Sequence, residues 1–369
     1  MAERLSKKVV ILSPLSRDHT SAHLIEDDNF WVSYFAKKKV KFRVVTSEYS
    51  KGQLLKNREI NPKRVSSFSE SRFFKKYSRL SLIWKLLQTN IKDSLVVIQG
   101  FEEISILCFL LSNLGRNNQY VLVSTNNISK GRFHRHGMIL RLILRAIFGL
   151  VDVVFCHTEC EIKIIKECIQ KNVNKFHIKK YHLAVAKQGG AANLNSRLII
   201  SFFGPVKHDK PLQPFLSLIH ADQSELFVYV LYKPGVLNKE DEAYLKSKKN
   251  VQIYEGWLTR DDFQMAMHNS YYVFLSHNEE YEGKLSGNLC DCLAYSVPFI
   301  AQNMSPANEL TDSYGNMGFI TDFSDPKWME YFLSSDPIGK RNLYLGAYKK
   351  FHQSYTYDTI VNELDRIMI

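Results

Sequence analysis

The feature that most constrains the fold is a series of short apolar runs, rich in β-branched residues, separated by segments long enough to hold a helix. The runs are KKVVILS, KFRVVTS, SLVVIQG, QYVLVST and VDVVFCH, followed by LIISFFG, LFVYVLY, VQIYEGW, YYVFLSH and VPFIAQ. Strands that are apolar throughout are buried on both faces, and crossover-length connections favour parallel pairing. The pattern therefore predicts an α/β chain built of doubly wound parallel sheets.

A segment rich in Gly, Ala and Asn, residues 185–196, interrupts this series of strands. We expect it to link a first domain, residues 1–184, to a second, residues 197–354. The pattern TYDTIVNELDRIMI predicts an amphipathic helix within 355–369 that packs back on the first domain. A chain of 369 residues that is 45% hydrophobic can build two cores of ordinary size. Because open α/β sheets bind ligands beyond the carboxyl ends of their strands, two domains facing each other would form a cleft.

Charge and cysteine content restrict the partners. A net charge of +12 predicts attraction to an anionic molecule or surface. We expect no nucleic-acid partner, because no aromatic-basic RNA-binding motif or recognition helix is evident. The six cysteines lack framework spacing, which indicates reduced thiols, and the pairs Cys156/Cys160 and Cys290/Cys292 lack the further ligands of a zinc site. The sequence therefore predicts no metal centre.

No segment of the sequence resembles a membrane span or a signal peptide. The apolar run near the start, in MAERLSKKVVILSP, is too short for a signal peptide. The longest apolar stretch, GMILRLILRAIFGLVDVVFC, is interrupted by Arg141, Arg145 and Asp152, which makes it a poor span. We therefore expect a cytoplasmic protein.

The first strand of the second domain is followed by groups suited to phosphate. The strand run ends at Gly204, and Lys207 and Lys210 follow before the next helix. Glycine lets the backbone approach a ligand, and lysines beside a helix start favour phosphate. A solvated loop with ordinary surface lysines would have the same composition.

A second stretch, EYEGKLSGNLCDCLAYSVPFIA, places Glu282 ahead of a predicted helix start at Ser286-Gly287. Unpaired amides at a helix start, where small residues allow close approach, form an anion pocket. Asp291 lies on the next turn, where its carboxylate can accept hydrogen bonds from a diol such as a ribose. A Ser-capped helix with an exposed acid is the plainer interpretation.

The order of these pieces resembles the donor-binding half of GT-B glycosyltransferases, particularly the GT4-like group that builds bacterial surface polysaccharides. The resemblance extends over about residues 197–325, and more weakly over the first half through VDVVFCHTECEIKIIKE. The matching positions are Lys207 and Lys210; Val251, Gly256 and Phe263; Glu282, Gly283, Asp291, Pro298 and Ile300; and Glu309, Leu310, Gly318 and Phe319.

The sequence also departs from the family pattern. Asp291 replaces a Glu, the spacing between the two carboxylates is one residue longer, and Ser296 replaces a Gly. The usual Gly-Gly is absent from SPLSRDHTSAH, and Asn126 and Asn127 follow the strand after which many relatives have a His. These changes affect the expected catalytic groups more than the expected nucleotide pocket.

The resemblance implies two Rossmann-like domains and transfer of a hexose-type sugar from a UDP- or GDP-linked donor. The acceptor would be a lipid-linked saccharide or a related molecule in surface polysaccharide synthesis, and no metal or cofactor would be needed. The implied donor-binding residues are Gly204, Lys207, Lys210, Gly256, Ser286, Gly287 and Asp291. The candidate catalytic residues are Glu282, which would orient the hexose, and Asp18, His19, Glu102 and Glu103, which would serve as bases; His134 and His136 are alternatives. A sugar-nucleotide epimerase of the same fold, or a non-catalytic subunit of a polysaccharide assembly complex, are the competing hypotheses.

A basic and apolar segment in the first domain predicts contact with a membrane. Residues 71–92, SRFFKKYSRLSLIWKLLQTNIK, contain six Lys or Arg and no acid, and a helix here would place Trp84 on an apolar side flanked by basic residues. Residues 131–148 form a second such segment. Basic amphipathic helices bind anionic membrane interfaces, although a core-facing helix with a basic solvated side shares the pattern. We expect a peripheral enzyme on the inner face of the cell membrane, with a polyprenyl-diphosphate-linked acceptor.

Overall fold

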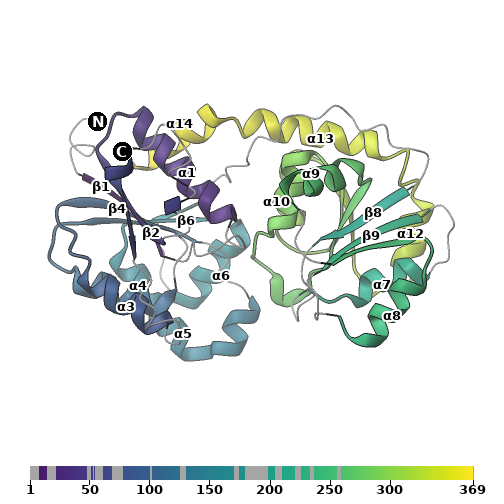
Figure 1. Ribbon diagram of the computed structural model, residues 1–369, viewed down its shortest axis with the longest axis horizontal. Coiled ribbons are helices and arrows are strands. Elements are labelled where there is room, and N and C mark those ends of the chain that lie inside the picture. The colour runs from purple at the N-terminus through teal and green to yellow at the C-terminus, as the bar shows by residue number, and fades with distance from the viewer. Residues whose placement is uncertain are drawn as a thin grey trace. The chain divides into compact units, whose positions relative to one another are not determined.

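The computed structural model comprises two compact units (Figure 1). The first contains residues 1–182 and 357–369, and the second contains residues 183–356. The structure describes residues 8–14, 22–47, 51–52, 54, 61–68, 78–99, 102–124, 130–169, 174–178, 198–203, 210–220, 226–232, 237–255 and 259–368.

The first unit is built on a sheet of seven parallel strands in the order β3-β2-β1-β4-β5-β6-β7. Its strands are β1 (Lys8–Ser13), β2 (Phe42–Ser47), β3 (Val65–Phe68), β4 (Ser94–Gln99), β5 (Gln119–Val123), β6 (Val153–Cys156) and β7 (Phe176–Ile178). Its helices are α1 (Ala22–Lys37), α3 (Ser78–Gln88), α4 (Glu103–Ser112), α5 (Lys130–Leu150), α6 (Glu159–Ile169) and α14 (Tyr357–Met368), with a 3-10 turn at Pro62–Arg64. The strand order reverses between β1 and β4, which is the topological switch point of this sheet.

Successive residues of the central strands in the first unit supply two different cores. Val10 and Leu12 of β1 pack in one cluster with residues of α3, α4, α5 and α6. Val9 and Ile11 pack in the other cluster with residues of α1 and α14. Side chains alternate across a strand, so an apolar strand of this kind must be covered on both faces. The first unit is therefore a three-layer α/β/α unit.

Helix α14 belongs to the first unit although it lies at the far end of the sequence. Ile360 and Leu364 are buried in the cluster that contains Trp31 of α1. Asp365 accepts a hydrogen bond of 2.8 Å from the Tyr34 hydroxyl and forms an ion pair with Lys38. The helix is thus held by an apolar face and by a polar contact at its edge.

The second unit repeats the same topology with six parallel strands in the order β10-β9-β8-β11-β12-β13. Its strands are β8 (Leu198–Phe203), β9 (Leu226–Tyr232), β10 (Val251–Glu255), β11 (Tyr272–Leu275), β12 (Phe299–Gln302) and β13 (Gly318–Thr321). Its helices are α7 (Gln213–His220), α8 (Lys239–Ser247), α9 (Arg260–Asn269), α10 (Gly287–Tyr295), α11 (Ala307–Tyr314), α12 (Trp328–Ser334) and α13 (Arg341–Ser354), with a 3-10 turn at Glu279–Tyr281. The switch point of this sheet lies between β8 and β11.

Aromatic side chains join the sheet of the second unit to its helices. Phe215 of α7 contacts Phe202 and Phe274 of the central strands, with ring centroids 4.9 and 5.3 Å apart. Phe263 of α9 contacts Phe203, with centroids 5.2 Å apart. Because Phe202 and Phe203 are successive residues, they face opposite sides of the sheet, so helices cover both faces.

The predicted fold class is confirmed, since both sheets are parallel and doubly wound. Each of the ten apolar runs contains a strand, and the structure adds the edge strands β3, β7 and β13. The predicted helix over 71–92 is shorter: α3 spans Ser78–Gln88 and residues 89–92 are not helical, while residues 71–77 lie outside the described chain. The predicted linker, residues 185–196, also lies outside it.

Candidate functional site

The switch point of the second unit brings two chain segments together at the carboxyl edge of its sheet. Lys210 follows β8, and the segment 276–286 follows β11. The Ser276 hydroxyl donates a hydrogen bond to the carbonyl of Pro211, and the Asn288 amide donates one to the carbonyl of Phe203. Neighbouring central strands whose connections lead to opposite sides leave a crevice where ligands of this fold class bind.

Two lysines lie on one aromatic ring at this edge of the sheet. The Lys210 ammonium lies 5.1 Å from the ring centroid of Tyr281, and the Lys284 ammonium lies 4.9 Å from the same centroid. Cations over a tyrosine face are attracted to the negative face of the ring, which holds both ammonium groups in place. The pair is a concentrated positive charge at the switch point.

His277 stacks against the same Tyr281 ring that the two lysines contact. Their ring centroids are 4.0 Å apart and the planes are within 11° of parallel. Burial lowers the pKa of His277 well below its ordinary value, and the nearby charges of Lys210 and Lys284 lower it further. The imidazole is therefore neutral at pH 7, and the positive charge of the site comes from the lysines.

The turn between β11 and α10 places Glu282 at the same edge. Asn278 caps the 3-10 turn by accepting a hydrogen bond of 3.1 Å from the amide of Glu280. Gly283 has φ of +86°, in the left-handed region that side chains with a Cβ disfavour. This glycine turns the chain so that Glu282 and Lys284 both lie close to Tyr281.

The amino terminus of α10 completes the site. Ser286 is the N-cap residue and is fully buried, yet its hydroxyl has no hydrogen-bond partner among the residues that the structure describes and makes no capping bond. Gly287 is exposed and Asp291, on the next turn, is half-buried. Helix amides, their dipole and an orphaned hydroxyl are groups that an anion satisfies.

The opposite side of α10 fixes its position in the unit. Leu289, Cys290, Cys292 and Leu293 are buried, and burial raises the pKa of Cys292 well above its usual value. These thiols therefore act as small apolar side chains.

Five predicted site residues lie on the two segments that meet at this sheet edge: Lys210 follows β8, and Glu282, Ser286, Gly287 and Asp291 lie on the connection from β11 into α10. Gly204, Lys207 and Gly256 lie outside the described residues. His277, Tyr281 and Lys284 also lie at this edge and were not predicted from the sequence. The signal that could have found them is their position, because each directly follows or lies near the carboxyl end of β11, where the topology predicts ligand contacts.

The predicted catalytic acids of the first unit lie after β4, at its own switch point. Glu102 is the N-cap of α4, and its carboxylate accepts hydrogen bonds of 2.9 and 2.5 Å from the amide and hydroxyl of Ser105. Glu103 is buried in the first turn of the helix. Asp18 and His19 lie outside the described residues, as do the side chains of His134 and His136 on α5.

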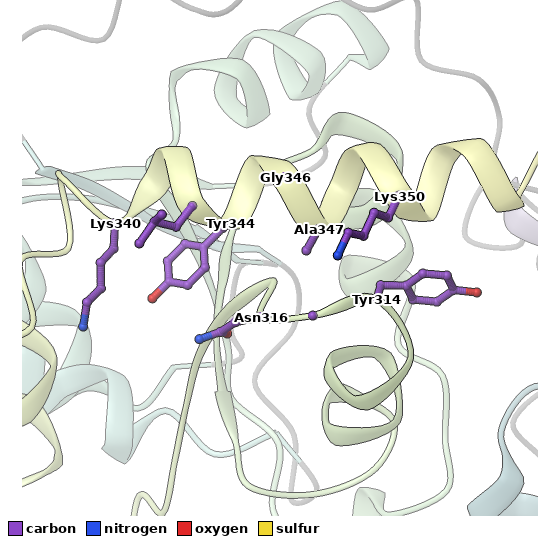
Figure 2. A pocket seen from close by; sticks show the side chains of 9 residues that line it. Tyr314, Asn316, Lys340, Tyr344, Gly346, Ala347 and Lys350 are labelled. Carbon is purple, nitrogen blue, oxygen red and sulfur yellow. The ribbon is translucent and has the colours of Figure 1, made fainter.

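A separate cavity of about 390 Å³ lies between α13 and the segment that joins α11 to β13 (Figure 2). Tyr314, Asn316, Lys340, Tyr344 and Lys350 line it. Because Asn316 precedes β13, this cavity lies at the amino edge of the parallel sheet, opposite the edge that holds Lys210. It is therefore distinct from the switch-point site. No cluster of three or more His, Cys, Asp or Glu among the described residues is placed to hold a metal ion.

No known protein-family model and no curated protein matches the chain. Solved structures match it over nearly its whole length. HepE of Anabaena, in complex with UDP and glucose, has a TM-score of 0.72 at 12% identity, with 98% of each chain covered. The lipopolysaccharide outer core galactosyltransferase WaaB has a TM-score of 0.64 at 11% identity, with 98% of this chain and 99% of WaaB covered.

A third structure, from Listeria monocytogenes and assigned as a UDP-N-acetylglucosamine 2-epimerase, has a TM-score of 0.60 at 12% identity, with 97% of this chain and 94% of that chain covered. These matches, together with the two doubly wound sheets, show that the chain has the GT-B fold, as the sequence predicted.

Proposed function

We propose that this chain is a GT4-like glycosyltransferase that transfers a hexose-type sugar from a UDP- or GDP-linked donor to a lipid-linked saccharide in surface polysaccharide synthesis. The observation that carries the proposal is the buried, orphaned Ser286 hydroxyl at the start of α10, on the same β11–α10 connection as Tyr281, whose ring Lys210 and Lys284 contact. A diphosphate satisfies such a group of donors and cations. The likeness to HepE, solved with UDP and glucose, supports a nucleotide-sugar donor.

In the proposed reaction, an acceptor hydroxyl attacks the anomeric carbon of the donor sugar. The bond from that carbon to the diphosphate oxygen breaks, and the nucleoside diphosphate leaves with the electron pair. Lys210, Lys284 and the amides of α10 stabilise the charge that develops on the leaving group, so we propose that no metal is needed. Asp291 binds the ribose hydroxyls and Glu282 binds the hexose.

The acceptor proton passes to a base of the first unit. Asp18, Glu102 and Glu103 are the proposed candidates, because the chain after β1 and β4 reaches the switch point of that sheet. The Glu102 carboxylate already accepts two hydrogen bonds from Ser105, as the N-cap of α4. This cap favours Asp18 and Glu103 over Glu102.

A polyprenyl-diphosphate-linked saccharide is the acceptor class that we propose. Such a molecule lies in the inner leaflet of the cell membrane, so we propose that the enzyme is cytoplasmic and works at that surface. No helix among the described residues is both long and apolar enough to span a membrane. A peripheral mode of contact is therefore the one that the proposal requires.

An epimerase is the second candidate function, favoured by the likeness to the Listeria structure. It would use the same donor site and convert a nucleotide sugar without an acceptor. The two functions differ in their products, because a transferase releases a nucleoside diphosphate and an epimerase releases an isomeric nucleotide sugar.

The test is to incubate the protein with a panel of nucleotide sugars, with and without polyprenyl-diphosphate-linked acceptors. We expect acceptor-dependent release of UDP or GDP. An isomerised nucleotide sugar formed without acceptor would establish the epimerase, and binding without any product would establish a non-catalytic subunit.

Two variants test the site itself. Lys210→Ala and Asp291→Ala should each weaken nucleotide binding by about 1.5 to 3 kcal/mol, because a charge-assisted contact is lost. The matched control is Lys248→Ala. The Lys248 ammonium also lies 5.1 Å from the centroid of a tyrosine ring, that of Tyr244 on α8, away from the proposed donor site. Unchanged nucleotide affinity in both site variants would refute the donor site.

A further inference from the structure

Three neighbouring helices of the first unit present apolar side chains to solvent. Helices α3, α4 and α5 pack side by side on one face of the sheet (Figure 1). Their exposed apolar side chains form the α3–α4–α5 face, which consists of Trp84 (60% exposed), Leu87 (42%), Ile104 (46%), Leu111 (50%), Met138 (75%), Ile139 (71%) and Leu142 (55%).

Helix geometry shows that these side chains point away from the sheet. In α3, Leu86 is buried in the core, and Trp84 lies about 160° from it around the helix. In α5, Leu144 is buried and Leu142 lies about 160° away. The apolar exposure is therefore on the outside of the layer, where no described element of the first unit packs.

The charge of this face is of one sign. Helices α3 and α5 contain no Asp or Glu, and the acid of α4, Glu103, is buried. Arg141 and Arg145 are exposed beside Leu142. By contrast, α6 on the same side of the sheet has the exposed acids Glu159 and Glu167. Lack of exposed acid thus distinguishes α3, α4 and α5 from their neighbour.

We infer that the α3–α4–α5 face binds the surface of an anionic lipid bilayer. Exposed Trp, Leu, Ile and Met enter the boundary between headgroups and acyl chains, and Arg pairs with anionic headgroups. A helix that begins after the break at Gly137, where φ is +46°, can lie flat on this boundary. A second copy of the chain is disfavoured as the occupant, because a two-fold interface would place Arg141 and Arg145 against like charges.

This inference deepens the proposed function, because a bilayer-bound first unit lies at the surface that holds a lipid-linked acceptor. The inference about the α3–α4–α5 face depends on exposed fractions and charges in the first unit, whereas the donor site lies in the second unit. The two claims can therefore fail separately.

The test is sedimentation of the full chain with vesicles of phosphatidylcholine, with and without phosphatidylglycerol. Binding should require phosphatidylglycerol and weaken as salt is raised. Arg141→Glu with Arg145→Glu should weaken partition at least about tenfold. The matched charge control is Lys349→Glu with Lys350→Glu, on exposed positions of α13, and it should bind like the parent.

Apolar contact is tested by Met138→Ser with Leu142→Ser, which should also weaken partition at least about tenfold. Its control is Met265→Ser with Leu343→Ser, which are 57% and 73% exposed in the second unit. Trp84 gives a direct signal in a Trp257→Phe background, because Trp31 and Trp328 are buried and Trp257, the fourth tryptophan, lies outside the described residues. Vesicles should shift Trp emission to shorter wavelength, and Trp84→Phe should remove this shift.

Equal binding to neutral and anionic vesicles, or no binding, would overturn the inference. So would a dimer in sedimentation equilibrium that the same variants dissociate, because the face would then be covered by a second copy. Measurements of UDP affinity distinguish failure of the membrane inference from failure of the proposed donor site. Variants of the face should bind UDP normally, whereas Lys210→Ala should bind vesicles normally and lose UDP.

Discussion

The two sheets share a strand order, yet the residues at their switch points differ in kind. Between β8 and β11, two lysines lie on Tyr281 beside a neutral histidine and an open helix start. Between β1 and β4, the strands end in buried Ser13 and Gln99. The topology supplies a crevice in both units, and the residues after the strands decide which ligand it suits.

The outer helices of the two units also differ in the kinds of side chain that they carry. The first unit exposes Trp84 on α3, and Leu142 beside Arg141 and Arg145 on α5, whereas the first turn of α8 in the second unit contains Glu240, Asp241 and Glu242. Our two proposals together assign a division of work, in which the second unit binds an anionic donor at its switch point and the first unit binds an anionic surface with its outer helices.

The largest expected effect concerns stability and should be confined to one unit. Leu364→Ala leaves a cavity where α14 packs against the core that contains Trp31, and should lower the unfolding free energy of the first unit by about 2 to 5 kcal/mol. Hydrogen exchange should report the loss in β1 and α1. The control is Leu343→Ala at a 73% exposed position. Equal loss of protection in β8 and β11 would mean that the two units unfold together.

The second prediction concerns Lys284, which the sequence analysis did not select. Lys284→Ala should weaken UDP binding by about 1.5 to 3 kcal/mol, as Lys210→Ala does, because both ammonium groups lie on the Tyr281 ring. Calorimetric titration with UDP measures this change, and Lys248→Ala is again the control. If Lys210→Ala weakened UDP binding and Lys284→Ala did not, Lys210 alone would supply the cationic contact.

The third prediction concerns pH. The pKa of His277 is held well below its ordinary 6.5 by burial and by the two lysines. Below about pH 6.5 the unfolded chain therefore binds a proton that the folded chain does not. The unfolding free energy falls as pH decreases, by up to about 1.4 kcal/mol per pH unit, until His277 itself protonates in the folded state.

His277→Asn should make the stability of the second unit fall less steeply between pH 6.5 and 5, as measured by urea titration at each pH. His352→Asn is the comparison, because burial alone lowers the pKa of His352. Lys210→Ala should reduce the slope that depends on His277 and leave the slope that depends on His352. An unchanged slope in His277→Asn would show that this ring does not stay neutral.

The smallest expected effect is the most specific. Ser286→Ala should weaken UDP binding by about 0.5 to 1.5 kcal/mol, because a hydrogen bond to the ligand is lost. It should leave the unfolding free energy within about 0.5 kcal/mol, because the hydroxyl makes no capping bond in the described structure. Loss of stability with normal UDP affinity would identify Ser286 as an ordinary cap.

The central strands could be predicted from the sequence because they are apolar on both faces, as Val9, Val10, Ile11 and Leu12 show. The edge strands β3, β7 and β13 have few such residues, since only one neighbouring strand and part of the helix layer cover them. Their pairing depends on the sheet that already exists. Sequence patterns therefore specify the middle of each sheet better than its borders.

The limits of the site prediction have a similar cause. Lys210 and Asp291 could be selected from their positions beside a strand end and a helix start. Lys284 could not, because its importance depends on the ring of Tyr281, to which the turn at Gly283 returns it and on which Lys210 also lies. In α3, the basic pattern predicted a helix longer than Ser78–Gln88, because charge alone does not specify where a helix ends.

The return of α14 to the first unit affects the order in which the protein can fold during synthesis. The aromatic side of α1, with Phe30 and Trp31, is covered in part by residues 357–369. These residues leave the ribosome after the whole of the second unit has been made. Domains generally fold as units from the amino terminus, but here the first unit stays incomplete until the second has emerged. Its exposed aromatic face is the surface that a chaperone would need to protect during that interval.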